Sequence, residues 1–329
     1  MMHTADRHQV TVRVPGKINI ELIVGPLRTD GYHELVTVFQ AVGVHDRVRV
    51  EPASSWSVRA GGPYGKHVPA NRTNLAARAA HLLAQYAPDF LDEVAGAEVG
   101  PVAISIDKHI PVAAGMAGGS ADAAAALVGC AELWNLTMPR DDLEAVGARI
   151  GADVPFLLHG GTAVGSGRGD EISPVLARGE AHWVLWVSTG DGLSTAAVYA
   201  EFDRLNAGQV VPAPEPSADL AAALRTMDSA AMGRLLRNDL APAALSLQPQ
   251  LQEVIDTGLD LGAQGATISG SGPTVAFLVG SQADALDLSM GLAARGPKGD
   301  IVRVTGPVPG AHVIDASGRG AGPRRGGWS

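Results

Sequence analysis

The sequence predicts an α+β fold, and three observations carry the prediction. At 329 residues and 46% hydrophobic content, the chain is long enough to form two cores or one large core. Some segments, such as residues 10–14, alternate strictly between apolar and polar side chains, whereas others, such as residues 74–86, have helical spacing. Strands and helices follow one another in unequal order, so a regular series of βαβ units is not expected.

The N-terminal segment predicts two strands, at residues 10–14 and 18–22, with a Pro-Gly break between them. A side-chain period of two puts Lys17, Asn19 and Glu21 on one face and apolar residues on the other. A polar row that contains a lysine is typical of an active-site strand. A solvated sheet face has the same pattern, so the row leaves both interpretations open.

Turn and cap signals justify the elements that follow. An Asp-Gly turn at residues 30–31 is followed by further strands, which are expected at residues 35–39, 44–51 and 102–107. Three helices are expected next: residues 74–86 with Asn74 as the N-cap, residues 120–134, and a helix with Pro139 near its first turn and Gly151 as its end.

A loop of small residues joins the strand at 102–107 to the helix at 120–134. Small residues let the backbone approach a ligand, and the first N–H groups of a helix lack internal partners, so the loop is suited to bind a triphosphate. It lacks both the Gly-Lys-Ser/Thr ending of the P-loop and the dinucleotide-binding Gly-x-Gly-x-x-Gly pattern. A tight turn packed on a sheet is the alternative. The candidate phosphate loop consists of Pro111, Val112, Ala113, Ala114, Gly115, Met116, Ala117, Gly118, Gly119, Ser120 and Ala121.

The C-terminal half follows a proline-rich stretch at residues 211–217, which predicts an extended linker or surface loop. Helical patterns cover residues 219–240 and 247–261. The last segment, residues 306–329, is rich in glycine and poor in apolar residues, so we expect a disordered tail.

Composition limits the partners of the chain. A net charge of −9, from 25 basic and 34 acidic residues, argues against nucleic acid or an anionic membrane as the main partner. The single cysteine, Cys130, excludes a disulfide within the chain and fits a reducing cytoplasm. No signal peptide or membrane span is expected, so we expect a soluble cytoplasmic protein that is either a monomer or a homodimer.

Three separated blocks resemble the GHMP kinase superfamily, which includes the galacto-, homoserine, mevalonate and phosphomevalonate kinases. Residues 15–19 resemble its N-terminal Pro-x-Lys-x-Asn strand, and residues 111–124 resemble its phosphate loop. A glycine turn with Gly270, Ser271 and Gly272, before a strand expected at 274–279, resembles its C-terminal glycine motif. The blocks follow the order of the family between about residues 10 and 304.

The resemblance implies the two-domain GHMP kinase fold. An N-terminal ribosomal-S5-like βα domain is expected at residues 8–175, and a C-terminal α/β sandwich domain at residues 180–305. The active site would lie in the cleft between them. ATP is the implied phosphoryl donor, with Mg²⁺ expected beside it and a small molecule as acceptor.

Two further blocks narrow the resemblance. Residues 30–35 (Asp-Gly-Tyr-His-Glu-Leu) and 151–155 (Gly-Ala-Asp-Val-Pro) resemble the branch that phosphorylates the 2-hydroxyl of a cytidine-diphosphate-linked methylerythritol in the non-mevalonate isoprenoid pathway. Another small-molecule kinase of the superfamily, of the homoserine or mevalonate type, is one alternative. A non-catalytic relative that binds a metabolite is the other.

The resemblance also implies the chemistry of single residues. Lys17 and Asp153 match the catalytic pair, in which the lysine would keep the aspartate ionised and polarise the attacking hydroxyl. Asp153 would act as a base or as a group that orients the hydroxyl. The alternative is that Asp153 serves only as a helix cap or turn residue. Ser120 is the candidate metal ligand. Ala117 and Ala121 depart from the glycine and serine that the family commonly has, and the loop can form with Ala117 if its φ is negative.

The remaining site residues are assigned by resemblance to the acceptor and the adenine. Tyr32 and His33 would recognise the cytidine. Tyr199 would lie on the far wall of the cytidine pocket, and simple packing of its helix is the alternative for this residue. The full set expected to bind the acceptor is Asn19, Tyr32, His33, Thr195, Tyr199, Gly270, Ser271 and Gly272. Lys108 and Asn74 match positions near the adenine, against the alternatives of a solvated lysine and a helix cap.

Overall fold

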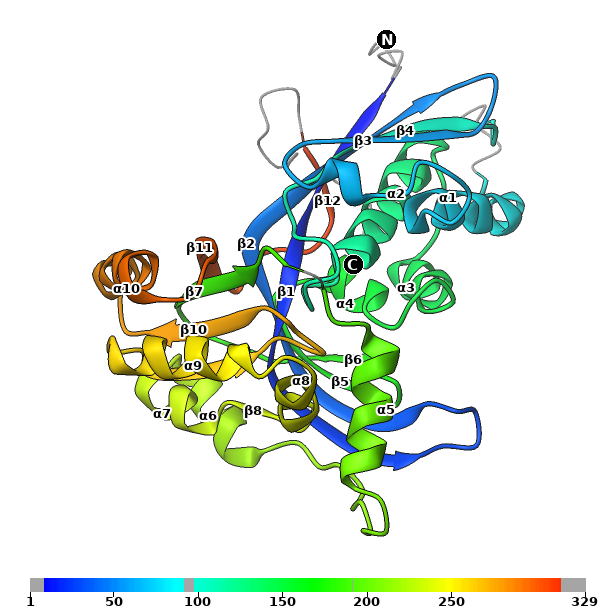
Figure 1. The fold of residues 1–329 in the computed structure, drawn as a ribbon. Coiled ribbons are helices and arrows are strands. Elements are labelled where there is room, and N and C mark those ends of the chain that lie inside the picture. The colour runs from blue at the N-terminus through cyan, green and yellow to red at the C-terminus, as the bar shows by residue number, and fades with distance from the viewer. Residues whose placement is uncertain (1–8, 92–97, 191, 315–329) are drawn as a thin grey trace.

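Two long antiparallel strands, β1 (Val10–Leu27) and β2 (His33–Pro52), run through the centre of the molecule (Figure 1). The computed structural model describes residues 9–91, 98–190 and 192–314. The Pro-Gly break shifts the register between β1 and β2 at Pro15 and Gly16 but does not end the strand. The separate strands expected at 10–14 and 18–22 are therefore one strand, because a β-bulge absorbs the irregularity.

The other strands of the first sheet pair with these two. The main path has the order β12–β1–β2–β4–β3, in which β3 is Ser57–Gly61, β4 is Val102–Asp107 and β12 is His312–Ile314. Beside it, β5 (Thr162–Ser166) pairs with β2 and with β6 (Glu171–Pro174), and β8 (Arg237–Asn238) runs parallel to β1.

Helices cover one face of this sheet. α1 (Leu75–Tyr86) and α2 (Gly118–Leu133) pack together, with α3 (Arg140–Ala148) and α4 (Val154–His159) beside them (Figure 1). Gly129 lets α2 approach β2 closely, since a β-carbon at this position would come within 2.8 Å of the Val50 side chain. Two short 3₁₀ helices, η1 (Gly65–His67) and η2 (Ala87–Phe90), flank α1.

The second sheet has the order β11–β7–β10–β9. Its strands are β7 (Ala181–Ser188), β9 (Gly265–Ile268), β10 (Val275–Val279) and β11 (Gly299–Gly306). Its helices are α5 (Thr195–Leu205), α6 (Ala218–Thr226), α7 (Ser229–Leu235), α8 (Ala241–Leu247), α9 (Gln250–Asp260) and α10 (Gln282–Arg295). Apolar residues of α8, α9 and α10 form one core with β7, β9 and β10, whereas the fully buried Trp183 belongs to the core shared with the first sheet.

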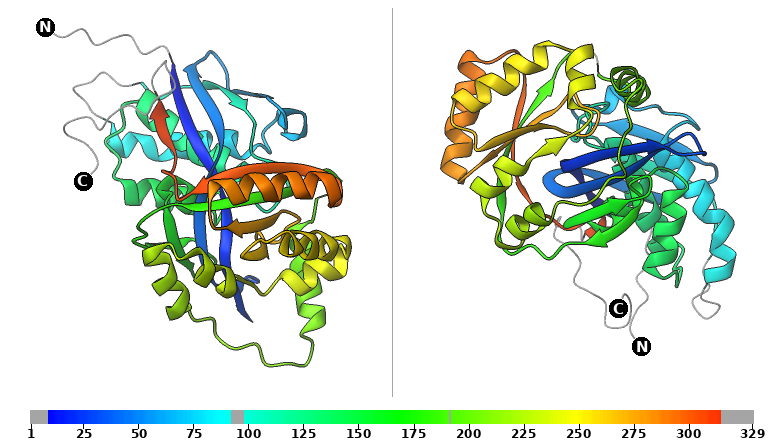
Figure 2. Two further views of the ribbon diagram at one scale, coloured as in Figure 1. Left: turned by 90° about the vertical axis from the view of Figure 1, so that its left-hand side faces the viewer. Right: turned by 90° about the horizontal axis from the view of Figure 1, so that it is seen from below.

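Two expectations about the C-terminal half need correction. The helix expected at 219–240 is divided, because Met227 has a left-handed backbone (φ 52°) that ends α6. Residues 306–314 are not a disordered tail: β12 pairs with β1, with Ile314 opposite Thr11 (Figure 2, left view). The expectation rested on the low average apolar content of residues 306–329. That average does not show that Val308, Val313 and Ile314 pack against the core. Residues 315–329 lie outside the described part of the chain.

No helix among the described residues is both long and apolar enough to cross a membrane.

Candidate active site

Lys17 lies in the middle of β1 with its ammonium group buried against polar partners. The side chain donates a hydrogen bond to Asn19 Oδ1 at 2.6 Å, and Nζ lies 3.7 Å from Asp153 Oδ1. The ammonium also lies 5.3 Å from the centre of the Phe39 ring. Burial lowers the pKa of Lys17, and the Asp153 carboxylate opposes that shift. The polar row of β1 is therefore buried, so it is not a solvated sheet face.

Asp153 lies at the N-terminal end of α4. It is the residue before Val154, and its side chain caps no backbone N–H group of the helix. About a third of the side chain is exposed (33%), whereas that of Lys17 is almost covered (6%). The carboxylate therefore faces both the lysine and open space, which is what a group that meets an incoming hydroxyl requires.

Asn19 is held by a chain of hydrogen bonds on the same face of β1. Its amide donates to Thr37 Oγ1 at 2.8 Å, and the Thr37 hydroxyl donates in turn to the carbonyl oxygen of Glu21 at 2.7 Å. All three residues are buried. This chain fixes the orientation of the Asn19 amide, so its oxygen stays aimed at Lys17.

The phosphate loop follows β4 and leads into α2, as expected. Its backbone contacts β1 directly, because the Lys17 N–H group donates to the Met116 carbonyl oxygen at 3.3 Å. The expectation of a negative φ at Ala117 is wrong: its φ is +56°, and that of Ala113 is +53°. The family's usual glycine would adopt this left-handed conformation more easily, and alanine does so at a cost of about 1–2 kcal/mol.

Lys108 occupies a different place from the one expected. Its ammonium is buried beneath the start of α2 and donates to Asp46 at 2.5 Å, to Asp122 at 2.8 Å and to the Gly118 carbonyl oxygen at 2.6 Å. With all three N–H donors used, the side chain has none left for an adenine. We refer to Lys108, Asp46 and Asp122 as the Lys108 cluster.

The Lys108 cluster secures both ends of the phosphate loop. Asp46 Oδ1 accepts hydrogen bonds from the backbone N–H groups of His109 and Ile110, at 2.6 and 2.8 Å, just before the loop. Lys108 itself holds Gly118, near the C-terminal end of the loop. Burial raises the pKa of Asp122, although the Lys108 charge opposes this. Two carboxyl groups thus share one ammonium, and burial favours the protonated form of Asp122.

Asn74 caps the N-terminus of α1, which was the alternative to a role in adenine binding. Its side-chain oxygen accepts from the N–H groups of Ala76 and Ala77, and its amide donates to the Pro69 carbonyl oxygen at 2.9 Å. Only 4% of the residue is exposed. These contacts explain Asn74 without an adenine.

The glycine turn, residues 269–273, meets the phosphate loop from the second sheet. A β-carbon on Gly115 (φ +75°) would overlap the Ser269 carbonyl oxygen. One on Gly270 would lie 3.4 Å from Lys17 Nζ and 3.3 Å from Asn19 Oδ1. The turn thus lies close to Lys17 and Asn19, and a side chain at Gly270 would crowd both of them.

The remaining acceptor candidates lie along α5. Ser271 and Thr195 place their hydroxyl oxygens 3.0 Å apart, which joins the glycine turn to the first residue of α5. His33 stacks on Tyr199, with ring centres 5.5 Å apart. Burial raises the pKa of Tyr199, so its phenol stays protonated.

Tyr32 stands apart from the stack of His33 and Tyr199. Its ring is 56% exposed and lies under the Arg168 guanidinium, 5.3 Å from the ring centre. No ring contact joins Tyr32 to His33 or Tyr199 within the described part of the chain. The structure therefore brings His33, Thr195, Tyr199 and the glycine turn together, and leaves Tyr32 at the rim.

Ser120, at the start of α2, offers an oxygen donor suited to Mg²⁺. A β-carbon placed on Gly151 would be 3.6 Å from Ser120 Oγ, so the hydroxyl faces the segment that carries Asp153. A hydroxyl and a carboxylate are hard oxygen ligands, and Mg²⁺ usually takes only one or two protein ligands beside phosphate oxygens and water. Ser120 and Asp153 fit that requirement.

Known proteins share this architecture. The family model of the GHMP kinases N terminal domain matches residues 74–161, and that of the GHMP kinases C terminal domain matches residues 220–297. A 4-diphosphocytidyl-2-C-methyl-D-erythritol kinase of Mycolicibacterium gilvum is 50% identical over 313 residues, which cover 93% of each chain. The chain belongs to the 4-diphosphocytidyl-2-C-methyl-D-erythritol kinase family of GHMP kinases. It is accordingly an ATP-dependent kinase with a small-molecule acceptor.

Solved structures agree with this family. A crystal structure of 4-(cytidine 5'-diphospho)-2C-methyl-D-erythritol kinase is 32% identical, with a TM-score of 0.68, and the match covers 90% of this chain and 98% of that one. A homoserine kinase from Cytophaga hutchinsonii has a TM-score of 0.70 at only 19% identity, over 95% and 100% of the two chains. The latter likeness concerns the fold alone, so it does not favour the homoserine-type alternative.

Several residues that build the 4-diphosphocytidyl-2-C-methyl-D-erythritol kinase site escaped the sequence analysis. Asp46 and Asp122 secure the phosphate loop, Thr37 orients Asn19, and Ser269 contacts Gly115. A signal was available for Asp122, because a carboxylate between alanines of a helix that is apolar on all sides needs a partner when the helix is buried. The others depend on contacts between distant segments, which no local pattern reveals.

Proposed function

We propose that the cleft between the two sheets transfers the γ-phosphoryl group of ATP to the 2-hydroxyl of 4-diphosphocytidyl-2-C-methyl-D-erythritol. The observation that carries the proposal is the position of the Lys17–Asp153 pair between the phosphate loop and the glycine turn. The family of the chain supplies the acceptor, and the buried polar strand β1 supplies the catalytic face. We also propose that the two family domains extend over residues 8–175 and 180–305.

The chain's own groups can carry each part of the reaction. The acceptor hydroxyl would lie between Lys17 Nζ and Asp153, so that the carboxylate accepts its proton as the oxygen attacks the γ-phosphorus. The bond from that phosphorus to the bridging oxygen then breaks and ADP leaves. A loose transition state makes small demands on the base, so Asp153 serves mainly to orient the hydroxyl.

The phosphate loop would hold the triphosphate through backbone groups. The N–H groups that begin α2 have no partners within the helix, and they add to the positive end of its dipole. Ser120 and Asp153 would be the protein ligands of Mg²⁺, which, when bound, neutralises charge on the β- and γ-phosphates. Lys108 acts from below the loop, through Gly118, and not on the nucleotide itself.

The acceptor wall is suited to a cytidine. His33 is buried and aligned by a contact of 2.9 Å between its Nδ1 atom and the Gly25 carbonyl oxygen, and its ring lies flat against Tyr199. Its Nε2 atom lies 3.1 Å from Asp203 Oδ1, so both ring nitrogens have protein partners and the ordered ring would offer a base its stacking surface. Thr195 and Ser271 would bind oxygens of the diphosphate or of the sugar.

A competition among acceptors tests the proposal. Release of ADP is measured with the cytidylated methylerythritol, mevalonate and homoserine in parallel, and Lys17→Met serves as the control for background ATPase activity. We expect turnover of the cytidylated acceptor alone, and none by Lys17→Met. Turnover of mevalonate or homoserine at a comparable rate would overturn the choice of acceptor, and binding of the acceptor without turnover would support the non-catalytic alternative.

A further inference from the structure

The outer face of the first sheet carries a cluster of arginines far from the catalytic pair. α1 and α2 cover the other face, which β1 and β2 line with valines such as Val12 and Val50. The exposed side holds Arg13 on β1, Arg47 and Arg49 on β2, and Arg59 on β3. We refer to these four residues as the arginine face.

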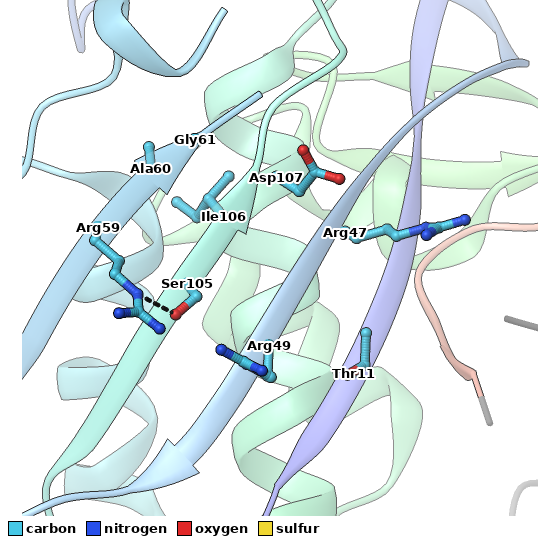
Figure 3. Close-up of a pocket in the computed structure, with 9 residues that line it drawn as sticks. All are labelled: Thr11, Arg47, Arg49, Arg59, Ala60, Gly61, Ser105, Ile106 and Asp107. Atoms are coloured by element: carbon cyan, nitrogen blue, oxygen red, sulfur yellow. Dashed lines mark hydrogen bonds between the residues drawn. The ribbon is translucent and has the colours of Figure 1, made fainter. Parts of the chain in front are cut away.

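The strand register places these side chains in two adjacent rows. Thr11, Arg49, Ser105 and Arg59 are successive cross-strand partners in one row, and Arg13, Arg47 and Asp107 in the next. Neighbouring strands lie about 4.8 Å apart, so the backbones of Arg49 and Arg59 lie about 10 Å apart with Ser105 between them. Figure 3 shows both guanidinium groups on either side of Ser105, and Arg59 donates to the Ser105 hydroxyl at 2.8 Å.

These arginines border a shallow depression of about 450 Å³, whose lining includes Arg47, Arg49, Arg59 and Ser105 (Figure 3). Within residues 9–91, 98–190 and 192–314, no carboxylate forms an ion pair with Arg47, Arg49 or Arg59. The one acidic group in the lining, Asp107, is paired with His109 at 3.1 Å. Unpaired guanidinium groups around a hydroxyl are the donors that bind phosphoryl oxygens, since each can offer two parallel N–H groups.

The arrangement carries a cost that an anion would relieve. Arg13 and Arg47 are directly opposite each other on β1 and β2, and like charges in that position destabilise a sheet. The Nδ1 atom of His45 lies 3.1 Å from an Arg13 nitrogen, so the arginine charges also act on the His45 ring. Burial, and after it the positive charge of Arg13, lowers the pKa of His45 to about 4. Positive side chains are therefore concentrated at this face, although the chain as a whole has a net charge of −9.

We propose that the arginine face is a second binding site, separate from the catalytic cleft, for a small molecule that carries a diphosphate group. One phosphoryl group lies over Ser105 between Arg49 and Arg59, and the other reaches Arg47. Thr11 precedes Lys17 by six residues on the same strand, about 20 Å away, so a ligand here does not touch the catalytic pair. The proposal is independent of the identity of the acceptor in the cleft.

Calorimetry with inorganic diphosphate tests the site, with the phosphate loop blocked by a saturating non-hydrolysable ATP analogue. We expect one diphosphate to bind per chain, and at least tenfold weaker binding by Arg49→Gln/Arg59→Gln. Arg234→Gln/Arg295→Gln, an equal change of charge at exposed arginines of α7 and α10, is the matched control and should bind normally. A single Arg49→Lys variant keeps the charge but loses the second parallel N–H donor, so its affinity for diphosphate should lie between those of the double glutamine variant and the control.

The source of the diphosphate and the position of the site are tested separately. Cytidine diphosphate and a short alkyl diphosphate, measured in the same way, distinguish a nucleotide from a lipid-like ligand. In proton NMR, bound diphosphate should raise the pKa of His45, because the anion offsets the arginine charges. The absence of binding at millimolar diphosphate, equal weakening by Arg234→Gln/Arg295→Gln, or an unchanged His45 titration would each overturn the proposal.

Discussion

The hydroxyl of Ser269 donates a hydrogen bond to the carbonyl oxygen of Gly115 over 2.9 Å, and it thereby joins the glycine turn to the phosphate loop. Asn238 holds the same turn from behind, because its amide donates to the carbonyl oxygens of Ile268 and Gly270, both at 2.7 Å. The region around Lys17 is thus assembled from two sheets whose loops fix one another.

The first prediction concerns Asp153. Asp153→Asn keeps the shape of the side chain and removes the charge, so we expect kcat to fall by about 10²–10⁴, the usual effect of a lost acid–base group. The dissociation constant for ATP should stay near that of the wild type. Asp141→Asn, at an exposed carboxylate on α3, is the matched control. Wild-type turnover by Asp153→Asn would remove Asp153 from the mechanism.

The second prediction concerns the proton on Asp122. Burial raises its pKa above the ordinary value of 3.8, so its contribution to stability is fully present below about pH 4 and is lost as the pH rises through the raised pKa. Asp122→Asn mimics the protonated acid and should flatten that part of the curve of Tm against pH between 5 and 9. Asp46→Asn should instead raise the KM for ATP, because Asp46 accepts from the N–H groups of His109 and Ile110. The same slope in wild type and Asp122→Asn would show that Asp122 is ionised.

The third prediction concerns the left-handed backbone of Ala117. Ala117→Gly should raise the free energy of unfolding by about 1 kcal/mol, because glycine adopts this conformation without steric cost. Ala117→Val should lower it and also raise the KM for ATP, since a β-branched residue is still less compatible with a positive φ. Urea unfolding and ATP titration measure the two effects. A stabilising valine would contradict the backbone conformation at this position.

The fourth prediction concerns the choice of acceptor. If His33 and Tyr199 bind the cytidine, His33→Ala should weaken acceptor binding by about 1–3 kcal/mol, the value of a lost stack or buried hydrogen bond. The KM for ATP serves as the internal control and should hardly change. Because the base is remote from the reacting hydroxyl, uncytidylated methylerythritol phosphate should lose turnover as well as affinity. Equal turnover of the two acceptors would exclude a cytidine pocket.

The fifth prediction concerns β12. Removal of all residues after Val304 deletes a strand that pairs with β1, together with the hydrogen bond from Ala311 to the Leu157 carbonyl oxygen. Burial of one valine or isoleucine contributes about 1.5–3 kcal/mol, so we expect the shortened chain to lose at least about 2 kcal/mol of unfolding free energy. Thermal unfolding of the shortened and full chains measures it, and an unchanged Tm would mean that β12 adds nothing.

The sequence predicted those elements that local patterns determine. β4 covers the residues expected for it, and Asn74 caps α1, because alternation and capping act over a few residues. Spacing also placed Lys17 and Asn19 on one face of β1. That this face is buried depends on Phe39, Thr37 and Asp153, which come from other segments.

The errors share one cause. Lys108 was expected near the adenine, with a solvated strand end as the alternative, whereas its burial depends in part on Asp46, from a strand 62 positions earlier. The role of residues 306–314 depends in the same way on a free edge of β1, some 300 positions away along the chain. Contacts over such distances leave no periodic signal in the sequence.

The pairing of β12 with β1 also has a consequence for synthesis on the ribosome. The edge of β1 around Thr11 emerges early, but its partner around Ile314 is made only after both sheets have been translated. Until then the nascent first sheet exposes an unpaired edge, which can pair with other chains. A chaperone that shields this edge should therefore matter most during the last part of translation, and a ribosome stalled before β12 should hold a chain that is prone to aggregate.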